Sequence, residues 1–164
     1  CCSMEYDTDI YSWNKVLVFN LGFDKKGKDV FNNWIYVPSK DFCFYRVGYY
    51  DNIFATKNMS LYVELGFGKN TDVIDVEYYK EKVLDDLKKA GIITDHKLIA
   101  SHFVIMDPAY VHITKESIRD VEEKKKLLAR NNIYSIGRYG SWTYCSIEDN
   151  ILEAKALMER LSDY

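Results

Sequence analysis

The sequence predicts an α+β fold, in which a mainly antiparallel β-sheet packs against two or three helices. Short runs rich in aromatic and β-branched residues follow one another closely in the first 70 residues. Helical periodicity dominates two later segments. The gaps between the early runs are too short for the crossover connections that parallel strands need, so we expect antiparallel neighbours. A chain of 164 residues is most simply one domain, spanning 1–164.

Four strands are expected before residue 70. Each is an apolar run with many aromatic and β-branched residues, bounded by turn-forming residues. These strands cover residues 13–23, 33–37, 42–50 and 59–67. Pro38 has no amide hydrogen and ends the second of them.

The hydrophobic period becomes helical after residue 75. Val76, Tyr79, Val83 and Leu87 recur at steps of three and four residues and would share one face of a helix. Gly91 follows this pattern directly and is a typical C-terminal cap. The spacing therefore predicts an amphipathic helix over 76–90.

The rest of the chain alternates between strand-like and helical patterns. Residues 97–106 form a further apolar run, followed by an expected turn at 107–110. Residues 114–130 are highly charged with a thin apolar seam, which indicates a solvated helix. A short strand at 133–136 and a terminal helix over 147–161 complete the prediction.

The composition excludes several classes of protein. The hydrophobic share of 48% and charged share of 29% are those of a folded globular chain. A net charge of -3 gives no general attraction to nucleic acid, and no apolar run is long enough to span a bilayer. The cysteines and histidines lack zinc-ligand spacing, so we expect no metal and a reducing, cytoplasmic setting.

The first residues look internal to a longer sequence. The chain starts Cys1-Cys2-Ser3, without an initiator Met and without the apolar core of a secretory signal. We therefore expect a fragment of a longer protein, and the role of Cys1 and Cys2 stays open.

The most informative segment runs from Ile133 to Tyr144 and reads IYSIGRYGSWTY. Gly137 and Gly140 bracket Arg138 and an aromatic residue, Tyr139. Glycine lets a backbone approach a flat or charged ligand closely, and the helix that follows presents N–H groups to anions. The segment is either a glycine-rich turn or part of a ligand site.

Ser146 and Asp149 have the spacing of a capping box at the start of the last helix. A structural role alone would explain Asp149. The same helix start could also direct N–H groups at a pyrophosphate, so both interpretations stay open.

Arg46 lies in an otherwise apolar strand, on the opposite face from Tyr45 and Val47. A buried guanidinium without an anion is costly. Arg46 therefore either reaches solvent or lines a cavity that receives a carboxylate or phosphate.

Five blocks of the chain together resemble the second half of the UDP-galactopyranose mutase-like flavoproteins, in the wider amine-oxidase-like superfamily. The blocks are 34–38, 44–47, 60–64, 109–111 and 133–142. In such proteins the first half holds a Rossmann-type FAD-binding unit, which this chain lacks. The resemblance implies that FAD binds only in a longer parent protein.

The resemblance also implies two groups of site residues. One group would contact the substrate and the other would contact FAD. The substrate group is Arg46, Tyr110 and Tyr144, and the FAD group is Gly137, Arg138, Tyr139, Gly140, Asp149 and Asn150. No catalytic residue is assigned.

The leading hypothesis is the substrate-binding portion of an FAD-dependent, mutase-like enzyme that acts on a nucleotide-linked sugar in surface polysaccharide or lipopolysaccharide biosynthesis. One alternative is an FAD-dependent amine oxidoreductase, and another is a non-catalytic binding domain. The isolated chain is expected to be inactive, and to self-associate through the surface that the missing half would cover.

Overall fold

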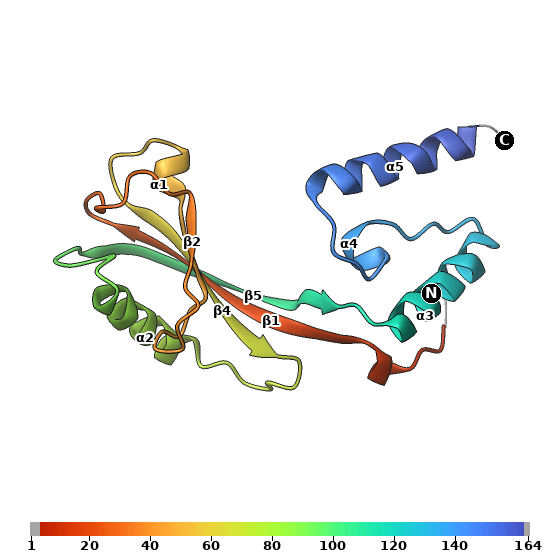
Figure 1. Cartoon of the computed structure of the whole chain (residues 1–164), viewed down its shortest axis with the longest axis horizontal. Coiled ribbons are helices and arrows are strands. Elements are labelled where there is room, and N and C mark those ends of the chain that lie inside the picture. Colours follow the sequence, from red (N-terminus) through yellow and green to blue (C-terminus); the bar gives the residue numbers. More distant parts are fainter. Residues whose placement is uncertain (1–3, 163–164) are drawn as a thin grey trace. The chain divides into compact units, whose positions relative to one another are not determined.

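The computed structural model describes residues 4–162, and Cys1 and Cys2 lie outside the described residues. It confirms the α+β prediction: a five-stranded antiparallel sheet with three main helices (Figure 1). The described residues form two compact units, one from Lys15 to Pro108 and the other from the two chain ends, up to Asn14 and from Ala109. We call these the sheet unit and the terminal unit.

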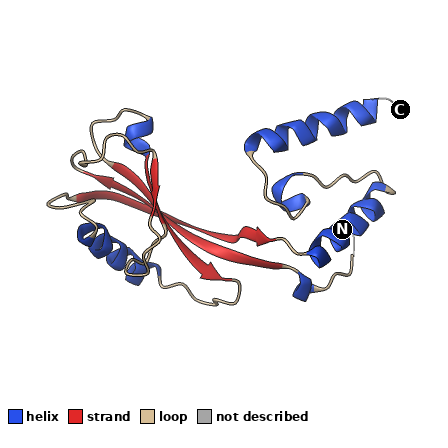
Figure 2. Ribbon diagram, in the orientation of Figure 1, coloured by secondary structure: helices blue, strands red, loops and turns tan. Residues whose placement is uncertain are grey.

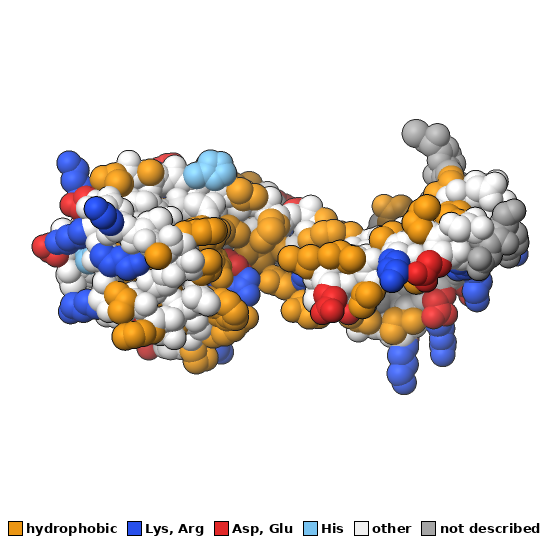
Figure 3. Space-filling model, turned by 90° about the horizontal axis from the view of Figure 1, so that it is seen from above, with side chains coloured by type: hydrophobic (Ala, Val, Ile, Leu, Met, Phe, Trp, Pro, Cys, Tyr) orange, Lys and Arg blue, Asp and Glu red, His pale blue; other side chains and the backbone are white. Residues whose placement is uncertain are grey.

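The sheet has the strand order β2-β3-β4-β1-β5. Figure 2 shows its strands in red, and Figure 3 shows the side chains coloured by type. The strands are β1 (Ser12–Phe23), β2 (Trp34–Tyr36), β3 (Arg46–Tyr49), β4 (Ser60–Gly68) and β5 (Leu98–His112). The antiparallel register sets Arg46 opposite Glu64 and Gly48 opposite Tyr62. The four early strands and the strand after residue 97 were therefore predicted correctly, apart from their ends.

One face of the sheet carries the core of the sheet unit. Leu17, Phe19, Leu21 and Phe23 alternate along β1 and are almost fully buried, while Asn20 between them is half-buried. The buried partners on the neighbouring strands are Val47, Tyr49, Leu61, Val63 and Leu65. Each such side chain contributes roughly 1.5–3 kcal/mol when buried, so this face fixes the register of the sheet.

Helix α2 (Val76–Lys89) covers that face through Val83 and Leu87 (Figure 1). Its first turn is capped by the Asp75 carboxylate, which accepts a hydrogen bond of 3.0 Å from the Tyr78 amide. Gly91 follows the helix with a φ of 69°, the left-handed conformation that favours glycine. The predicted helix and its glycine cap are both confirmed.

The terminal unit is mostly helical. It contains the short helix η1 (Thr8–Ile10), α3 (Lys115–Ala129), the single turn α4 (Gly137–Gly140) and α5 (Ile147–Ser162). The Thr114 side chain caps α3, accepting from the Ser117 amide at 3.0 Å. Another single turn, α1 (Tyr50–Ile53), belongs to the sheet unit.

Two predictions of local structure were wrong. Residues 133–136 form no strand, because no neighbouring strand pairs with them. The 107–110 segment is part of β5 rather than a turn. Pro108 lies in β5, which is an edge strand, and edge strands are where sheets usually accommodate proline.

Gly48 provides a test of the packing on the sheet. A Cβ atom at this position would lie 1.8 Å from Cε1 of Tyr62, whose ring crosses the strand there. We expect Gly48→Ala to lower the free energy of unfolding by about 1–3 kcal/mol, measured by urea denaturation. Gly68→Ala is the matched control, because nothing lies within 4 Å of its Cβ position. Equal losses for the two variants would contradict this account.

Asp86 provides a second test. This buried carboxylate accepts a hydrogen bond of 2.8 Å from the Cys43 amide. We expect Asp86→Ala to destabilise the protein by about 1–3 kcal/mol at pH 7, because the Cys43 amide loses its acceptor. Asp85→Ala on the exposed face should cost about 0.5 kcal/mol or less.

The effect of Asp86 should depend on pH. Burial alone would raise the pKa of its carboxyl, but the hydrogen bonds from Cys43 and the nearby Lys82 and Lys89 lower that pKa below its ordinary value. A lowered folded-state pKa means that the stabilisation is present above about pH 4 and is lost as the pH falls through the folded pKa. The stability difference between the wild type and Asp86→Ala should therefore shrink in acid. A constant difference down to pH 2 would contradict this assignment.

Candidate functional site

The first candidate site lies on the face of the sheet opposite α2, around Arg46. Nη2 of Arg46 forms an ion pair with Glu64 on β4, and Nη1 donates to the Tyr36 hydroxyl at 3.2 Å. The guanidinium carbon lies 5.6, 5.9 and 6.0 Å from three tyrosine rings, those of Tyr36, Tyr45 and Tyr62. Arg46 therefore lies among aromatic faces that favour a cation.

Glu64 supplies the anion that the sequence required for a buried Arg46. Its side chain is 7% exposed, and its second oxygen accepts a 2.5 Å hydrogen bond from the Tyr45 hydroxyl. Both carboxylate oxygens thus have partners inside the protein, and the charge of Arg46 is balanced locally. The sequence left two alternatives for Arg46, solvent or a cavity that receives an anion. In the structure its side chain is 20% exposed and its anion is a carboxylate of the same chain, while its predicted contact with a substrate stays a prediction.

The second candidate site lies in the terminal unit, where Arg138 contacts two tyrosine rings. Its guanidinium carbon is 4.9 Å from the centre of the Tyr110 ring and 4.8 Å from that of Tyr144. Each contact of this kind contributes about 0.5–2 kcal/mol, depending on solvent exposure. Three of the predicted site residues are therefore in direct contact.

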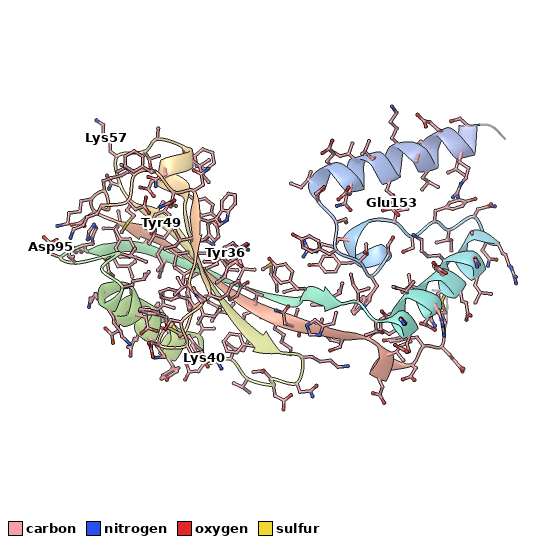
Figure 4. The ribbon with its side chains drawn as sticks, viewed as in Figure 1. Tyr36, Lys40, Tyr49, Lys57, Asp95 and Glu153 are labelled. Carbon is pink, nitrogen blue, oxygen red and sulfur yellow. The ribbon has the colours of Figure 1, made fainter. Side chains whose placement is uncertain are left out.

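The backbone of the predicted glycine motif is held by side chains of α5. Glu153, labelled in Figure 4, accepts a 2.8 Å hydrogen bond from the Gly137 amide. Asn150 accepts one of 3.1 Å from the Arg138 amide. A Cβ at Gly137, whose φ is 81°, would lie 2.9 Å from the Asn150 side-chain oxygen. Close packing against α5 thus requires this glycine.

Gly140 and Tyr139 are also explained by contacts within the terminal unit. A Cβ at Gly140 would lie 2.8 Å from the Ser135 hydroxyl oxygen, and that hydroxyl donates to the Gly140 carbonyl at 2.9 Å. Tyr139 is about half exposed and donates its hydroxyl to the Ala109 carbonyl at 3.1 Å. The motif forms the one-turn helix α4 rather than an open glycine loop.

Asp149 closes the predicted capping box. Its carboxylate accepts from the Ser146 amide at 2.7 Å, and the Asp149 amide donates to the Ser146 hydroxyl at 3.1 Å. The bonds from Ser146 lower the pKa of the Asp149 carboxyl. The capping role is confirmed, while its predicted contact with FAD stays a prediction.

Two buried donors of this unit have no hydrogen-bond acceptor among the described residues: Nε of Arg138 and Nε1 of Trp142. The Trp142 ring packs edge-to-face against Tyr11 and Trp13, at centroid distances of 5.0 and 5.9 Å. Unsatisfied buried donors are rare in folded proteins, so an acceptor from outside these residues would complete the site.

A pocket of about 770 Å³ opens beside α4 in the terminal unit. Two basic residues that line it make contacts within the unit. Lys125 donates a hydrogen bond of 2.8 Å to the Ser141 hydroxyl. The guanidinium carbon of Arg160 lies 5.5 Å from the centre of the Tyr134 ring. The pocket is lined by Glu122, Lys125, Lys126, Ala129, Tyr134, Ser135, Ile136, Glu153, Ala156, Leu157 and Arg160. Sequence reasoning missed it, because it assigned the Lys/Glu run of α3 to solvent.

Within residues 4–162, no three His, Cys, Asp or Glu side chains form a group that could hold a metal ion. In the same range, no helix is both long and apolar enough to cross a membrane.

The predicted site residues thus divide between the units. Arg46 belongs to the sheet unit, and the other eight belong to the terminal unit. Sequence reasoning also missed Glu64. The available signal was a charged residue in the apolar strand 59–67, since a glutamate there needs a buried partner.

Comparisons with known proteins agree with the predicted resemblance at the level of the fold. The chain is similar to reduced UDP-galactopyranose mutase, with a TM-score of 0.70 and 20% identity, over 83% of this chain and 30% of that one. It is also similar to a protein assigned as a protoporphyrinogen oxidase from Exiguobacterium sp. 255-15, with a TM-score of 0.70 and 16% identity, over 93% of this chain and 35% of that one. The chain thus spans about a third of each protein's length. No family model and no curated protein matches its sequence.

The Arg46–Glu64 pair can be tested by breaking it. We expect Glu64→Gln to cost about 3 kcal/mol of unfolding free energy, because it leaves a largely buried guanidinium without its anion. Replacing both partners, as Arg46→Met with Glu64→Leu, should cost less than the single change. As a control, Glu159→Gln on the exposed pair with Lys155 should cost about 0.5 kcal/mol or less. Additive effects at Arg46 and Glu64 would contradict the pairing.

Proposed function

We propose that this chain is the substrate-binding portion of an FAD-dependent enzyme that acts on a nucleotide-linked sugar in surface polysaccharide or lipopolysaccharide biosynthesis. The similarity to UDP-galactopyranose mutase, at a TM-score of 0.70 over 83% of the chain, carries this proposal. In this proposal the enzyme works in the cytoplasm, where nucleotide sugars are made available.

Arg46 is proposed to contact the diphosphate of the substrate. Its geometry allows this role, because the Nη1 bond to the Tyr36 hydroxyl is exposed and a phosphate oxygen could replace that hydroxyl. Glu64 would keep Nη2 and hold the guanidinium in one orientation. A fixed cation beside the departing diphosphate would stabilise the charge that grows there.

Tyr110 and Tyr144 are proposed to contact the substrate, and Arg138 is proposed to contact FAD. Arg138 Nε and Trp142 Nε1 are buried donors with no acceptor within residues 4–162, and this supports the proposal that a polar group of a ligand binds beside them. The amides of Gly137 and Arg138 already have acceptors on α5, so contact with FAD would involve side chains such as Arg138 and Tyr139. FAD, when bound, would supply the redox-active ring system.

The experiment uses the longest natural protein that contains this chain, purified without added cofactor. A flavin absorbance spectrum that shifts on addition of UDP-galactose, with isomerisation of the sugar only after reduction by dithionite, would support the proposal. Arg46→Lys should lower kcat/KM by about 10-fold or more, since a lysine lacks the planar fork that pairs with phosphate. Lys57→Arg, a change at an exposed residue of the sheet unit, is the control.

Two other outcomes would favour the alternatives. Release of peroxide from an oxidisable substrate, without sugar isomerisation, would identify an FAD-dependent oxidoreductase, which the similarity to the assigned protoporphyrinogen oxidase favours. A colourless protein that binds neither FAD nor UDP-galactose would leave a non-catalytic binding domain. The 164-residue chain by itself is expected to bind little FAD in any of these cases, and a yellow preparation of this chain would contradict the proposal.

A further inference from the structure

The edge strand β5 offers a pairing surface that no other strand of the described residues uses. In the strand order β2-β3-β4-β1-β5, it has a partner on one side only. An edge strand presents a row of backbone N–H and C=O groups that another strand can join. Most proteins protect such edges with lysines, prolines or bulges.

The outer edge of β5 is long and uncharged. Residues 98–106 read LIASHFVIM and contain no Asp, Glu, Lys or Arg. Four of their apolar side chains are substantially exposed: Ile99 at 58%, Phe103 at 47%, Val104 at 44% and Ile105 at 41%. Because Phe103 and Val104 are adjacent, apolar surface is exposed on both faces of the strand.

We propose that β5 pairs with β5 of a second copy of this chain, antiparallel, about a two-fold axis at His102. In a symmetric antiparallel pair, the N–H groups of each copy donate to the C=O groups of the other along the same edge. One strand edge can therefore pair with a second copy of itself. The proposal does not rest on the proposed enzymatic function.

The register follows from the charges that flank the uncharged run. With the axis at His102, Ile99 lies opposite Ile105 of the second copy, and Lys97 lies opposite Asp107. The Asp107 side chain forms an ion pair with Lys15 and is still 40% exposed, so it can also form an ion pair with Lys97 of the second copy. Opposite charges directly across a strand pair are favourable.

Neighbouring registers lose this match. An axis at Ser101 would set Asp107 opposite Asp95, which repels. An axis at Phe103 would set Lys97 opposite Ala109 and Asp107 opposite Ile99. Pro108 has no amide hydrogen and limits pairing beyond Asp107. Of these three registers, the one with its axis at His102 pairs all of residues 98–106 and sets Lys97 opposite Asp107 at both ends.

A cysteine placed on the axis tests the register directly. Residues directly opposite in an antiparallel pair have Cα atoms about 4.5–5.5 Å apart, within the range that a disulfide spans. With the native cysteines replaced by serine, His102→Cys should form a disulfide-linked dimer under mild oxidation. Ile99→Cys is the matched control, because its two copies would be six residues out of register, roughly 20 Å apart.

Sedimentation velocity tests the interface without cross-linking. The unmodified chain should sediment as a dimer that dissociates on dilution, and Val104→Lys should raise the dissociation constant by 10-fold or more. Val73→Lys, at a position 83% exposed outside the sheet, should leave it unchanged. A monomeric unmodified chain, or equal cross-linking of His102→Cys and Ile99→Cys, would overturn the proposal.

Discussion

The alternation of buried and exposed residues along β1 and β4 is the constraint on which the sheet unit depends. Leu17, Phe19 and Leu21 must all face α2, and a slip of one residue would turn them all to the other face. The register that satisfies this core also sets Arg46 opposite Glu64 and Gly48 opposite Tyr62. The Arg46–Glu64 pair, on the face opposite α2, is thus a consequence of the apolar packing on the face that α2 covers.

Local patterns predicted most of the fold because the long elements carry strong signals. The α2 region has a clear helical period and a glycine cap, and β1 is a twelve-residue strand of aromatic and β-branched character. The failures are at places where a local pattern depends on a distant partner. Residues 133–136 have strand-like composition but no strand beside them, and 107–110 continues an edge strand despite its proline.

The candidate sites show the same limit. Sequence alone left Arg46 either in solvent or beside an anion, and could not show that Glu64, eighteen residues later, lies directly opposite. The resemblance implied site roles for Arg138, Tyr110 and Tyr144, but could not show that both tyrosine rings contact the guanidinium of Arg138. The sequence leaves open whether the glycines of 137–140 form a turn or make room for a ligand, and in the structure the side chains of Asn150 and Ser135 lie close to them.

Helix α5 has no buried residue, and it contacts the rest of the terminal unit through hydrogen bonds of Asn150 and Glu153 and through Arg160 beside the Tyr134 ring. Such bonds contribute little net free energy in water compared with the burial of large apolar side chains. The last helix is therefore a part of the chain that can separate locally while the sheet core stays folded. Because the same two side chains hold the amides of Gly137 and Arg138, local opening of α5 would release these donors together, and the availability of this backbone to an anion is coupled to the position of one helix.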